Sequence, residues 1–365
     1  MTSLTITSVQ CIPMRLPFHH WTSAPLFAGK PRTTLDSALV RVETAGGIVG
    51  WGESYCVDTV ALNSIFENLV TPLTIGKLAD DPSLAFHLQR TLHNLGRSGP
   101  VLHALAGLDI ALWDIKGKAE GVPIYELLGG KKRDQIPAYA SLLQYYADPD
   151  SIARNVTRAL EEGYREVKLH ERTTVALEAA RGAMGQGMPL MLDTNCAWLP
   201  TEATTEIEAM LPYDPFWIEE PIWSPDDTDA LLRLREKTTA KIAVGENASS
   251  VQQLLTRVAL NAVDYIQPSV IKLGLSASWQ VAQATVGTST TFAPQVAFFG
   301  PGYLASLHML AASDCQSSLE RLYVELKQTP YATTVPIQNG YVHIPDSPGL
   351  GADPDFAFAS GEFSH

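Results

Sequence analysis

Short apolar runs alternate with amphipathic stretches through the second half of the chain, and this alternation limits the possible folds more than any other feature. Eight apolar runs begin near residues 136, 166, 189, 216, 241, 263, 290 and 318. Stretches of helical periodicity such as 150–162 and 225–238 lie between them. Strands that alternate with helices favour parallel pairing, and eight such units in succession predict a βα barrel.

The first third of the chain has a different pattern. Alternating apolar and polar residues predict strands over 4–14, 37–43 and 48–53, and the turn residues 45–47 predict a hairpin between the last two. Residues 101–119 have helical periodicity with few polar positions, which predicts a helix buried on most sides. Residues 17–32 have neither periodicity and are expected to form a loop. The tail, 340–356, returns to strand and loop patterns and is expected to pack against the N-terminal region.

Composition excludes several classes of protein. Of the 365 residues, 45% are apolar and only 18% are charged, which excludes a disordered chain. The net charge of −13 argues against nucleic acid as a partner. We expect a soluble, cytoplasmic protein without a membrane segment, because no apolar run approaches the length of a span and the four cysteines are far apart.

Carboxylates follow three consecutive strands of the predicted barrel. Asp193 ends the third strand, Glu219 and Glu220 end the fourth, and Glu246 ends the fifth. Catalytic residues of βα barrels lie at this end of the strands, so these acids are expected to meet. An all-oxygen set that must be neutralised selects Mg²⁺, or Mn²⁺, over Zn²⁺. The alternative is that some of these acids cap loops or pair with Lys and Arg.

The second strand of the barrel supplies a lysine and a histidine two residues apart. Because side chains alternate along a strand, Lys168 and His170 share a face and point into the predicted mouth. A lysine beside a divalent cation loses its proton more easily and can act as a base near pH 7. The alternative is a lysine that pairs with the acids beside a core histidine.

Several motifs together resemble the enolase superfamily, in its mandelate racemase-like branch. They are the segment 107–130, the WIEEP run at 217–221, the PDSPGLG run at 345–351, and the series Asp193, Glu219 and Glu246. The resemblance implies a modified (β/α)8 TIM barrel of (β/α)7β type over 131–330. It also implies an α+β capping domain formed by 1–130 and completed by a C-terminal segment, 331–365. A homo-oligomer is expected on the same ground.

The resemblance also implies a chemistry and assigns roles to residues. The reaction is removal of a proton from the carbon next to a substrate carboxylate, with one Mg²⁺ stabilising the enediolate that forms. The implied metal ligands are Asp193, Glu219 and Glu246, and Asn195, Glu220 and Asn247 are neighbours that orient them. Lys168 occupies the base position on strand two. Glu320, on strand eight, occupies the position of a carboxyl group that hydrogen-bonds the substrate carboxylate.

Three departures from the branch patterns concern the opposite face of the substrate. Gln295 replaces the strand-seven histidine of the mandelate racemase-like dyad, and Ser269 replaces its supporting aspartate. Gln267 stands where a muconate-cycloisomerase-like chain has a lysine, and Lys272 lies further along and does not match that base. We therefore expect one-sided chemistry, since Gln295 can hydrogen-bond a substrate hydroxyl but cannot exchange a proton.

The leading hypothesis is a Mg²⁺-dependent dehydratase or related lyase acting on a small sugar acid. Lys168 would remove the α-proton and His170, as imidazolium, would protonate the leaving hydroxyl. A racemase, epimerase or cycloisomerase is the nearest alternative, and a non-catalytic binding relative is an alternative from another class. A barrel glycosidase fits poorly, because its second carboxylate on strand seven would be Gln295.

Substrate-binding residues are expected in the loop of the N-terminal domain and beside it. His20 and Trp21 lie in the loop, and Tyr55 follows the third N-terminal strand. Together with Asn195 they are our candidates for contacts with the substrate. The alternative is that residues 17–32 form an ordinary surface loop.

Overall fold

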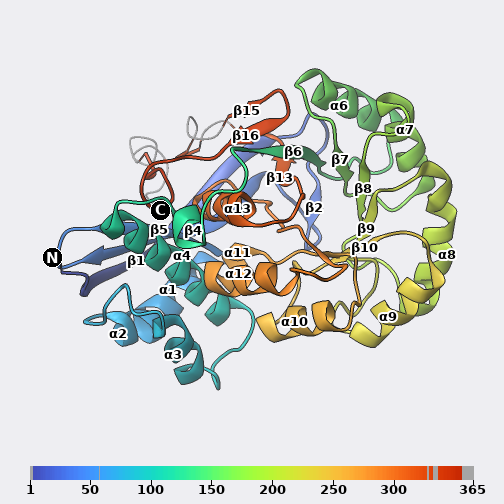
Figure 1. Ribbon diagram of the computed structural model, residues 1–365. Helices are drawn as coiled ribbons and strands as arrows, with labels where there is room; N and C mark the ends of the chain where they lie inside the picture. The colour runs from blue at the N-terminus through green and yellow to red at the C-terminus, as the bar shows by residue number, and fades with distance from the viewer. Residues whose placement is uncertain (1–2, 57, 327–328, 332–335, 356–365) are drawn as a thin grey trace.

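The computed structural model describes residues 3–56, 58–326, 329–331 and 336–355. It contains an antiparallel sheet with helices on one side and a ring of parallel strands surrounded by helices (Figure 1). This arrangement confirms the predicted α/β class, with an α+β cap and an enolase-type barrel. Within the C-terminal segment predicted to return to the cap, 331–365, residues 332–335 and 356–365 lie outside the described residues.

The capping sheet has the strand order β14-β1-β4-β5, with all pairs antiparallel. Its strands are β1 (Ile6–His19), β4 (Thr34–Thr44), β5 (Val49–Tyr55) and β14 (Glu325–Leu326), and a small hairpin is formed by β2 (Leu26–Phe27) and β3 (Lys30–Pro31). The helical segments of this region are α1 (Thr59–Ile65), η1 (Phe66–Val70), α2 (Thr71–Thr74), α3 (Leu84–Thr91), α4 (Pro100–Glu120) and α5 (Ile124–Leu127).

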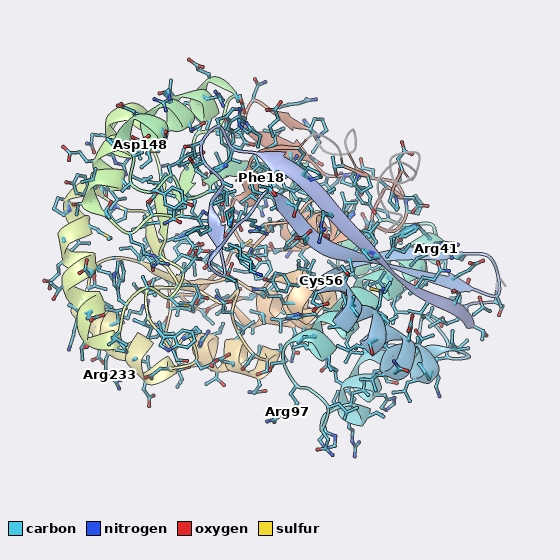
Figure 2. All side chains as sticks on the ribbon, turned by 180° about the vertical axis from the view of Figure 1, so that it is seen from behind. Phe18, Arg41, Cys56, Arg97, Asp148 and Arg233 are labelled. Atoms are coloured by element: carbon cyan, nitrogen blue, oxygen red, sulfur yellow. The ribbon has the colours of Figure 1, made fainter. Side chains whose placement is uncertain are left out.

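Strand β1 is longer than the sequence predicts. It continues through residues expected to belong to the loop, because Phe18 and His19 pair with Leu326 and Glu325 of β14. Figure 2 shows β1 running from the capping sheet toward the barrel, with Phe18 near its end. A partner strand more than 300 residues away in sequence cannot be inferred from local periodicity.

All eight predicted barrel strands are present. They are β6 (Gln135–Leu142), β7 (Val167–Leu169), β8 (Leu190–Asp193), β9 (Trp217–Glu219), β10 (Ile242–Val244), β11 (Tyr265–Ile266), β12 (Thr291–Phe292) and β13 (Leu319–Tyr323). Neighbours from β6 to β12 pair in parallel, and β13 pairs in parallel with β6. Between β12 and β13, the Ser317 hydroxyl donates to the Phe292 carbonyl at 2.7 Å.

Helices follow one another around the outside of the barrel strands (Figure 1). They are α6 (Pro149–Glu161), α7 (Thr174–Met184), α8 (Pro200–Met210), η2 (Leu211–Tyr213), α9 (Thr228–Lys237), α10 (Val251–Ala259), α11 (Val270–Leu273), α12 (Leu275–Ala284) and α13 (Pro301–Ala312). Their apolar faces and the strands enclose the largest hydrophobic core. No helix in the described part of the chain combines the length and the apolar character needed to cross a membrane.

The capping sheet is buried on both faces, which fixes the cap over the barrel. One face packs with α4 and the shorter helices around Val40 and Leu108. The other face brings Leu16 and Trp51 against Phe299 and Leu322 of the barrel. Burial of apolar surface on both sides therefore holds the cap and the barrel together.

The tail contacts both parts of the molecule. The strands β15 (Ile337–Gln338) and β16 (Tyr341–His343) form a hairpin, and β16 pairs antiparallel with the start of β6. Further on, the Leu350 amide donates to Asp114 of α4 at 2.8 Å, and Gly349 pairs with Pro123.

Close packing of β5 against α4 yields a stability prediction. A Cβ on Gly52 would lie 1.8 Å from the Gly107 carbonyl oxygen, so Gly52→Ala is expected to lower the free energy of unfolding by about 3 kcal/mol. Gly182, in α7, has no atom within 4 Å of its would-be Cβ. Gly182→Ala should therefore raise stability by ~0.5 kcal/mol. Urea unfolding of both variants tests this pair, and equal effects would contradict it.

Candidate active site

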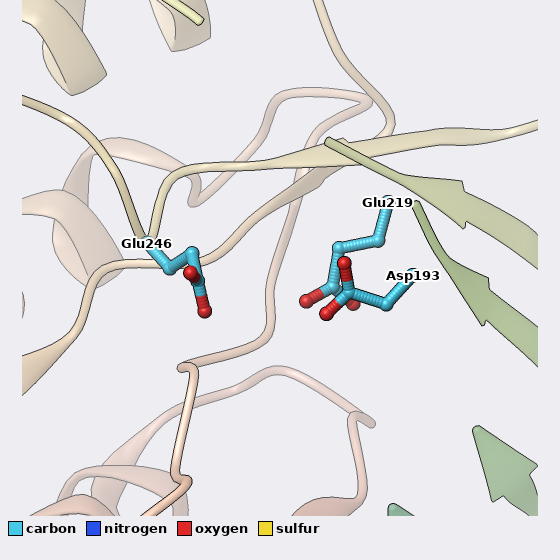
Figure 3. A group of neighbouring side chains, drawn as sticks. All are labelled: Asp193, Glu219 and Glu246. Atoms are coloured by element: carbon cyan, nitrogen blue, oxygen red, sulfur yellow. The ribbon is translucent and has the colours of Figure 1, made fainter. Parts of the chain in front are cut away.

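Three carboxylates meet at the carboxyl ends of adjacent barrel strands. Asp193 ends β8 and Glu219 ends β9, where the two residues are paired in register, and Glu246 lies two residues beyond β10. One oxygen from each lies within 4.8 Å of the others. Figure 3 shows the three side chains directed into a common space, with Glu246 facing the other two. The structure thus brings together the three acids that the sequence singles out.

Hydrogen bonds fix the orientation of the two buried acids. The Asn195 backbone and side-chain amides both donate to Asp193 Oδ1, at 3.0 and 2.8 Å. Trp217 Nε1 and Gln267 Nε2 donate to Glu219 Oε2, at 3.0 and 2.8 Å. The remaining oxygens, Asp193 Oδ2 and Glu219 Oε1, therefore face the interior of the site.

The third acid is held more loosely. The Asn247 side-chain amide donates to Glu246 Oε1 at 3.3 Å, and Lys272 Nζ lies 3.9 Å from the same oxygen. Glu220 instead accepts from the Gly245 amide at 2.9 Å and from the Cys196 thiol. Of the three predicted orienting neighbours, Asn195 and Asn247 contact a carboxylate of the triad directly. Glu220 contacts the backbone before Glu246.

Lys168 lies at the centre of the carboxylates and is 1% exposed. Its Nζ is 2.8 Å from Glu219 Oε1, 2.8 Å from Glu320 Oε1 and 3.3 Å from Asp193 Oδ2. Burial lowers the pKa of Lys168, but these carboxylates outweigh burial and hold it well above its usual value. A divalent cation on the acids would weaken their effect on the ammonium, since it becomes the largest local charge.

His170 lies beside Lys168 with a defined tautomer. Its Nδ1 is 2.6 Å from the Leu142 carbonyl, which can only accept, so Nδ1 carries the proton. Its Nε2 lies 3.3 Å from Asp193 Oδ2. Burial and the Lys168 charge lower the pKa of His170, which favours a neutral imidazole rather than the imidazolium that the sequence argument invoked.

Glu320 faces Lys168 from strand β13. In addition to the ion pair, it accepts from the Ser141 hydroxyl at 2.8 Å and from the Val296 amide at 2.7 Å. Burial raises the pKa of Glu320, but Lys168 and these donors outweigh it and the pKa lies below the usual range. In this arrangement Glu320 is a carboxylate that accepts hydrogen bonds.

A cavity of about 220 Å³ opens over these groups, which is room for a small organic acid. Barrel and cap both line it. Among the predicted residues its lining includes Tyr55, Lys168, His170, Asp193, Asn195, Glu246, Gln295 and Glu320. The lining also contains charged residues that the sequence argument did not assign to the site: Arg32, Arg172 and Lys272. Arg172 continues the alternation of Lys168 and His170, and that signal could have identified it.

His20 and Trp21 pack beside the cavity lining rather than in it. The centroid of the His20 ring lies 5.5 Å from that of Tyr145 with the two rings tilted, and His20 is 2% exposed. The Trp21 ring lies 5.1 Å from Tyr323, with the Arg158 guanidinium 4.3 Å above it. The part of the predicted loop that lines the cavity is instead Pro25–Phe27 and Arg32.

Glu53 joins the cap to the barrel beneath the cavity. It accepts from the Ser37 hydroxyl at 2.7 Å and from the Gly302 amide at 3.0 Å, at the start of α13. Burial raises the pKa of Glu53 from 4.5 to about 7. Because the pKa of Glu53 is higher in the folded state than in the unfolded state, protonation of this carboxyl stabilises the fold. The contribution is fully present below pH 4.5 and is lost as the pH rises through about 7.

This shift yields a prediction for stability against pH. Between pH 4.5 and 7 the free energy of unfolding of the parent should fall by about 3 kcal/mol more than that of Glu53→Gln, which has no carboxyl group to titrate. Urea unfolding at several pH values measures the difference. Parallel curves for the two proteins would contradict the prediction.

Comparison with known proteins identifies the family. Residues 15–129 match the mandelate racemase/muconate lactonizing enzyme N-terminal domain, and residues 151–358 match the enolase C-terminal domain-like family. The chain belongs to the enolase superfamily. This confirms the resemblance read from the sequence, and the triad of Asp193, Glu219 and Glu246 is typical of the magnesium site of these enzymes.

Relatives in the superfamily catalyse more than one reaction. The chain is 30% identical to D-galactarolactone cycloisomerase of Agrobacterium fabrum, over 86% of this chain and 88% of that one. It is 30% identical to D-xylonate dehydratase of Haloferax volcanii, over 86% and 82%. The 3,6-anhydro-D-galactonate cycloisomerase of Zobellia galactanivorans has a similar structure, with a TM-score of 0.84, 26% identity and 98% of each chain covered. The protein is therefore an enolase superfamily enzyme whose relatives include dehydratases and cycloisomerases.

Proposed function

We propose that this enzyme removes the α-proton of a sugar-acid carboxylate and eliminates water from the β-carbon, with Mg²⁺ held by Asp193, Glu219 and Glu246. The donor set fits this ion, because three carboxylates supply only oxygen ligands and their oxygens converge within 4.8 Å. When bound, the ion supplies positive charge to the substrate carboxylate and to the enediolate that develops from it. Mn²⁺ has the same ligand preferences.

One observation in particular supports elimination of water as the proposed reaction. Lys168 Nζ and His170 Nε2 each lie 3.3 Å from the same oxygen, Asp193 Oδ2, so both groups reach one point on one side of the cavity. Lys168 is the residue placed to take the α-proton. The Nδ1 hydrogen bond leaves His170 Nε2 without a proton, so Nε2 can receive the proton that Lys168 removes and deliver it to the leaving hydroxyl.

The residues on the side of the cavity opposite Lys168 support the same reaction. Gln295 and Ser269 line the cavity there and are 7% and 1% exposed. Neither a side-chain amide nor an aliphatic hydroxyl is an effective general acid or base near neutral pH. In an elimination, the C–H and C–O bonds can break on one face, the proton leaves with the hydroxyl as water, and the resulting enol becomes a keto acid.

A cycloisomerase is the second candidate, because ring opening by loss of a β-oxygen needs the same proton abstraction on one face. Two of the relatives named above are cycloisomerases. Lys272, from the segment after β11, also lines the cavity and adds a cation away from Lys168. A racemase is disfavoured, since it returns a proton to the face where Gln295 lies.

Turnover in D₂O separates these candidates. The purified enzyme with Mg²⁺ would be incubated with open-chain sugar acids and with their lactones, and the products followed by NMR. Loss of water from an open-chain acid supports the dehydratase, and ring opening without water loss supports the cycloisomerase. Deuterium at the α-carbon of a product with inverted configuration and no loss of water would indicate a racemase or epimerase. If no acid loses its α-proton, either in turnover or by exchange with deuterium, the proposed function is wrong.

A further inference from the structure

Two arginines line the cavity in addition to the metal triad, and neither has a role in proton abstraction. Arg32 belongs to the segment between β3 and β4 of the cap, and Arg172 follows β7 of the barrel. Among the described residues neither arginine forms an ion pair. Asp36 and Glu246 line the same space, but Asp36 pairs with Arg15 and Glu246 lies nearest to Lys272. Within the described part of the chain, the two arginines therefore face the cavity without an ion pair of their own.

The partners of Arg32 leave most of its guanidinium available. Its Nε donates to the Thr34 carbonyl at 3.4 Å, and its planar group packs over the Phe27 ring at 4.8 Å. Asp36 also lines the cavity, but its carboxylate pairs with Arg15 at 2.8 Å and accepts from the Thr34 hydroxyl. The flat face of Arg32 is thus held by an aromatic ring, while its terminal nitrogens keep their donors for another group.

Arg172 lies closer to the solvent than Lys168 and His170, the two residues proposed to move protons. Lys168, His170 and Arg172 alternate along one stretch of chain, and their exposure increases in that order. The Lys168 side chain is 1% exposed, that of His170 is 17% exposed, and Arg172 is exposed at the rim. A substrate whose reacting carboxylate lies beside Lys168 would extend outward past His170 toward Arg172.

We infer that the substrate carries a second carboxylate, at the end remote from the reacting carbon, and that Arg32 and Arg172 bind it. This inference rests on the proposed function for the position of the reacting carboxylate. A guanidinium presents paired donors that match a carboxylate, which a neutral sugar terminus does not. The substrate class is therefore a sugar dicarboxylate or its lactone, rather than the corresponding monocarboxylate.

Matched pairs of acids test the inference. The pairs are galactarate with galactonate and glucarate with gluconate, assayed with Mg²⁺, and 6-phosphogluconate tests whether a distal phosphate substitutes for the carboxylate. The dicarboxylate should have a kcat/KM at least about tenfold higher, the low end expected for a charge-assisted hydrogen bond. Arg32→Gln and Arg172→Gln should each raise KM for the dicarboxylate more than for the monocarboxylate, so that the ratio falls.

Arg97→Gln is the matched control. Arg97 is exposed in the segment between α3 and α4 and is not among the residues that line the cavity, so its loss should leave the ratio unchanged. Equal or better turnover of the monocarboxylates, or ratios unaffected by both cavity variants, would overturn the inference. Preference for 6-phosphogluconate would replace the second carboxylate by a phosphate and overturn it as stated.

Calorimetry separates failure of this inference from failure of the proposed function. If no acid is turned over, binding of galactarate and galactonate is compared in the parent enzyme and in the Arg32→Gln, Arg172→Gln double variant. Tighter binding of galactarate that the double variant loses would support the inference although the reaction is another one. Equal or undetectable binding of both acids would overturn it.

Discussion

Replacing Lys168 with methionine is expected to lower kcat by about 10³-fold or more, within the range for loss of a general base. Deuterium exchange at the substrate α-carbon should be lost in parallel, because both depend on the same proton transfer. Methionine keeps much of the length and packing of the side chain and removes the ammonium. Its effect on the reaction is measured by steady-state kinetics and by NMR in D₂O.

The same substitution should also change stability. It leaves Glu219, Glu320 and Asp193 buried without the cation that now pairs with them. Removing one partner of a buried pair typically destabilises by about 3–5 kcal/mol. Unfolding should therefore require less urea without Mg²⁺, and added Mg²⁺ should recover part of the difference.

Lys237→Met is the control for loss of a lysine, because Lys237 is exposed at the end of α9. It should leave kcat and stability close to those of the parent. A Lys168→Met enzyme that is folded and keeps more than about a tenth of kcat would show that another residue is the base.

Replacing Glu246 with glutamine is expected to weaken Mg²⁺ binding by about 100-fold or more and to reduce activity accordingly, since each decade of Kd is 1.4 kcal/mol. Glu246 is the most informative of the three carboxylates to change. Its side chain is 18% exposed and its nearest cation is Lys272 at 3.9 Å, whereas Asp193 and Glu219 are tied to Lys168. The substitution therefore tests the metal site with least disturbance of the buried ion pairs.

Calorimetric titration with Mg²⁺ measures the effect directly. Glu208→Gln, on the exposed side of α8, is the matched control and should leave the Kd unchanged. A chelator should abolish the activity of the parent enzyme, and Mg²⁺ or Mn²⁺ should restore it. An unchanged Mg²⁺ affinity in Glu246→Gln would contradict the assignment of Glu246 to the metal.

Local sequence patterns were sufficient to predict the barrel and the end of the barrel at which the three acids lie. Each barrel strand is a short apolar run bounded by polar residues, because a strand that is buried on both faces needs apolar side chains at successive positions. Acids directly after such runs are carried to the same rim by parallel pairing. For this reason Asp193, Glu219 and Glu246 could be grouped before their distances were known.

Other expectations depend on contacts between distant segments, which local sequence does not contain. The loop residues His20 and Trp21 were chosen for their chemistry, but β1 continues through His19 by pairing with β14, and both rings then pack against Tyr145 and Tyr323. The expected imidazolium of His170 is disfavoured by burial and by Lys168. Both effects depend on neighbours that local sequence does not contain.

The sequence by itself determined the barrel with its cap, the carboxylate triad, the pairing of Lys168 with His170 on one face, and the absence of a titratable group at positions 267, 269 and 295. These follow from periodicity and from residue identity. Only the tertiary structure decided that Lys168 is enclosed by three carboxylates, that His170 is protonated on Nδ1, and that Arg32 reaches the same cavity as Arg172. The reason is physical: charge, burial and cavity shape depend on distances through space, and segments far apart in the chain set those distances.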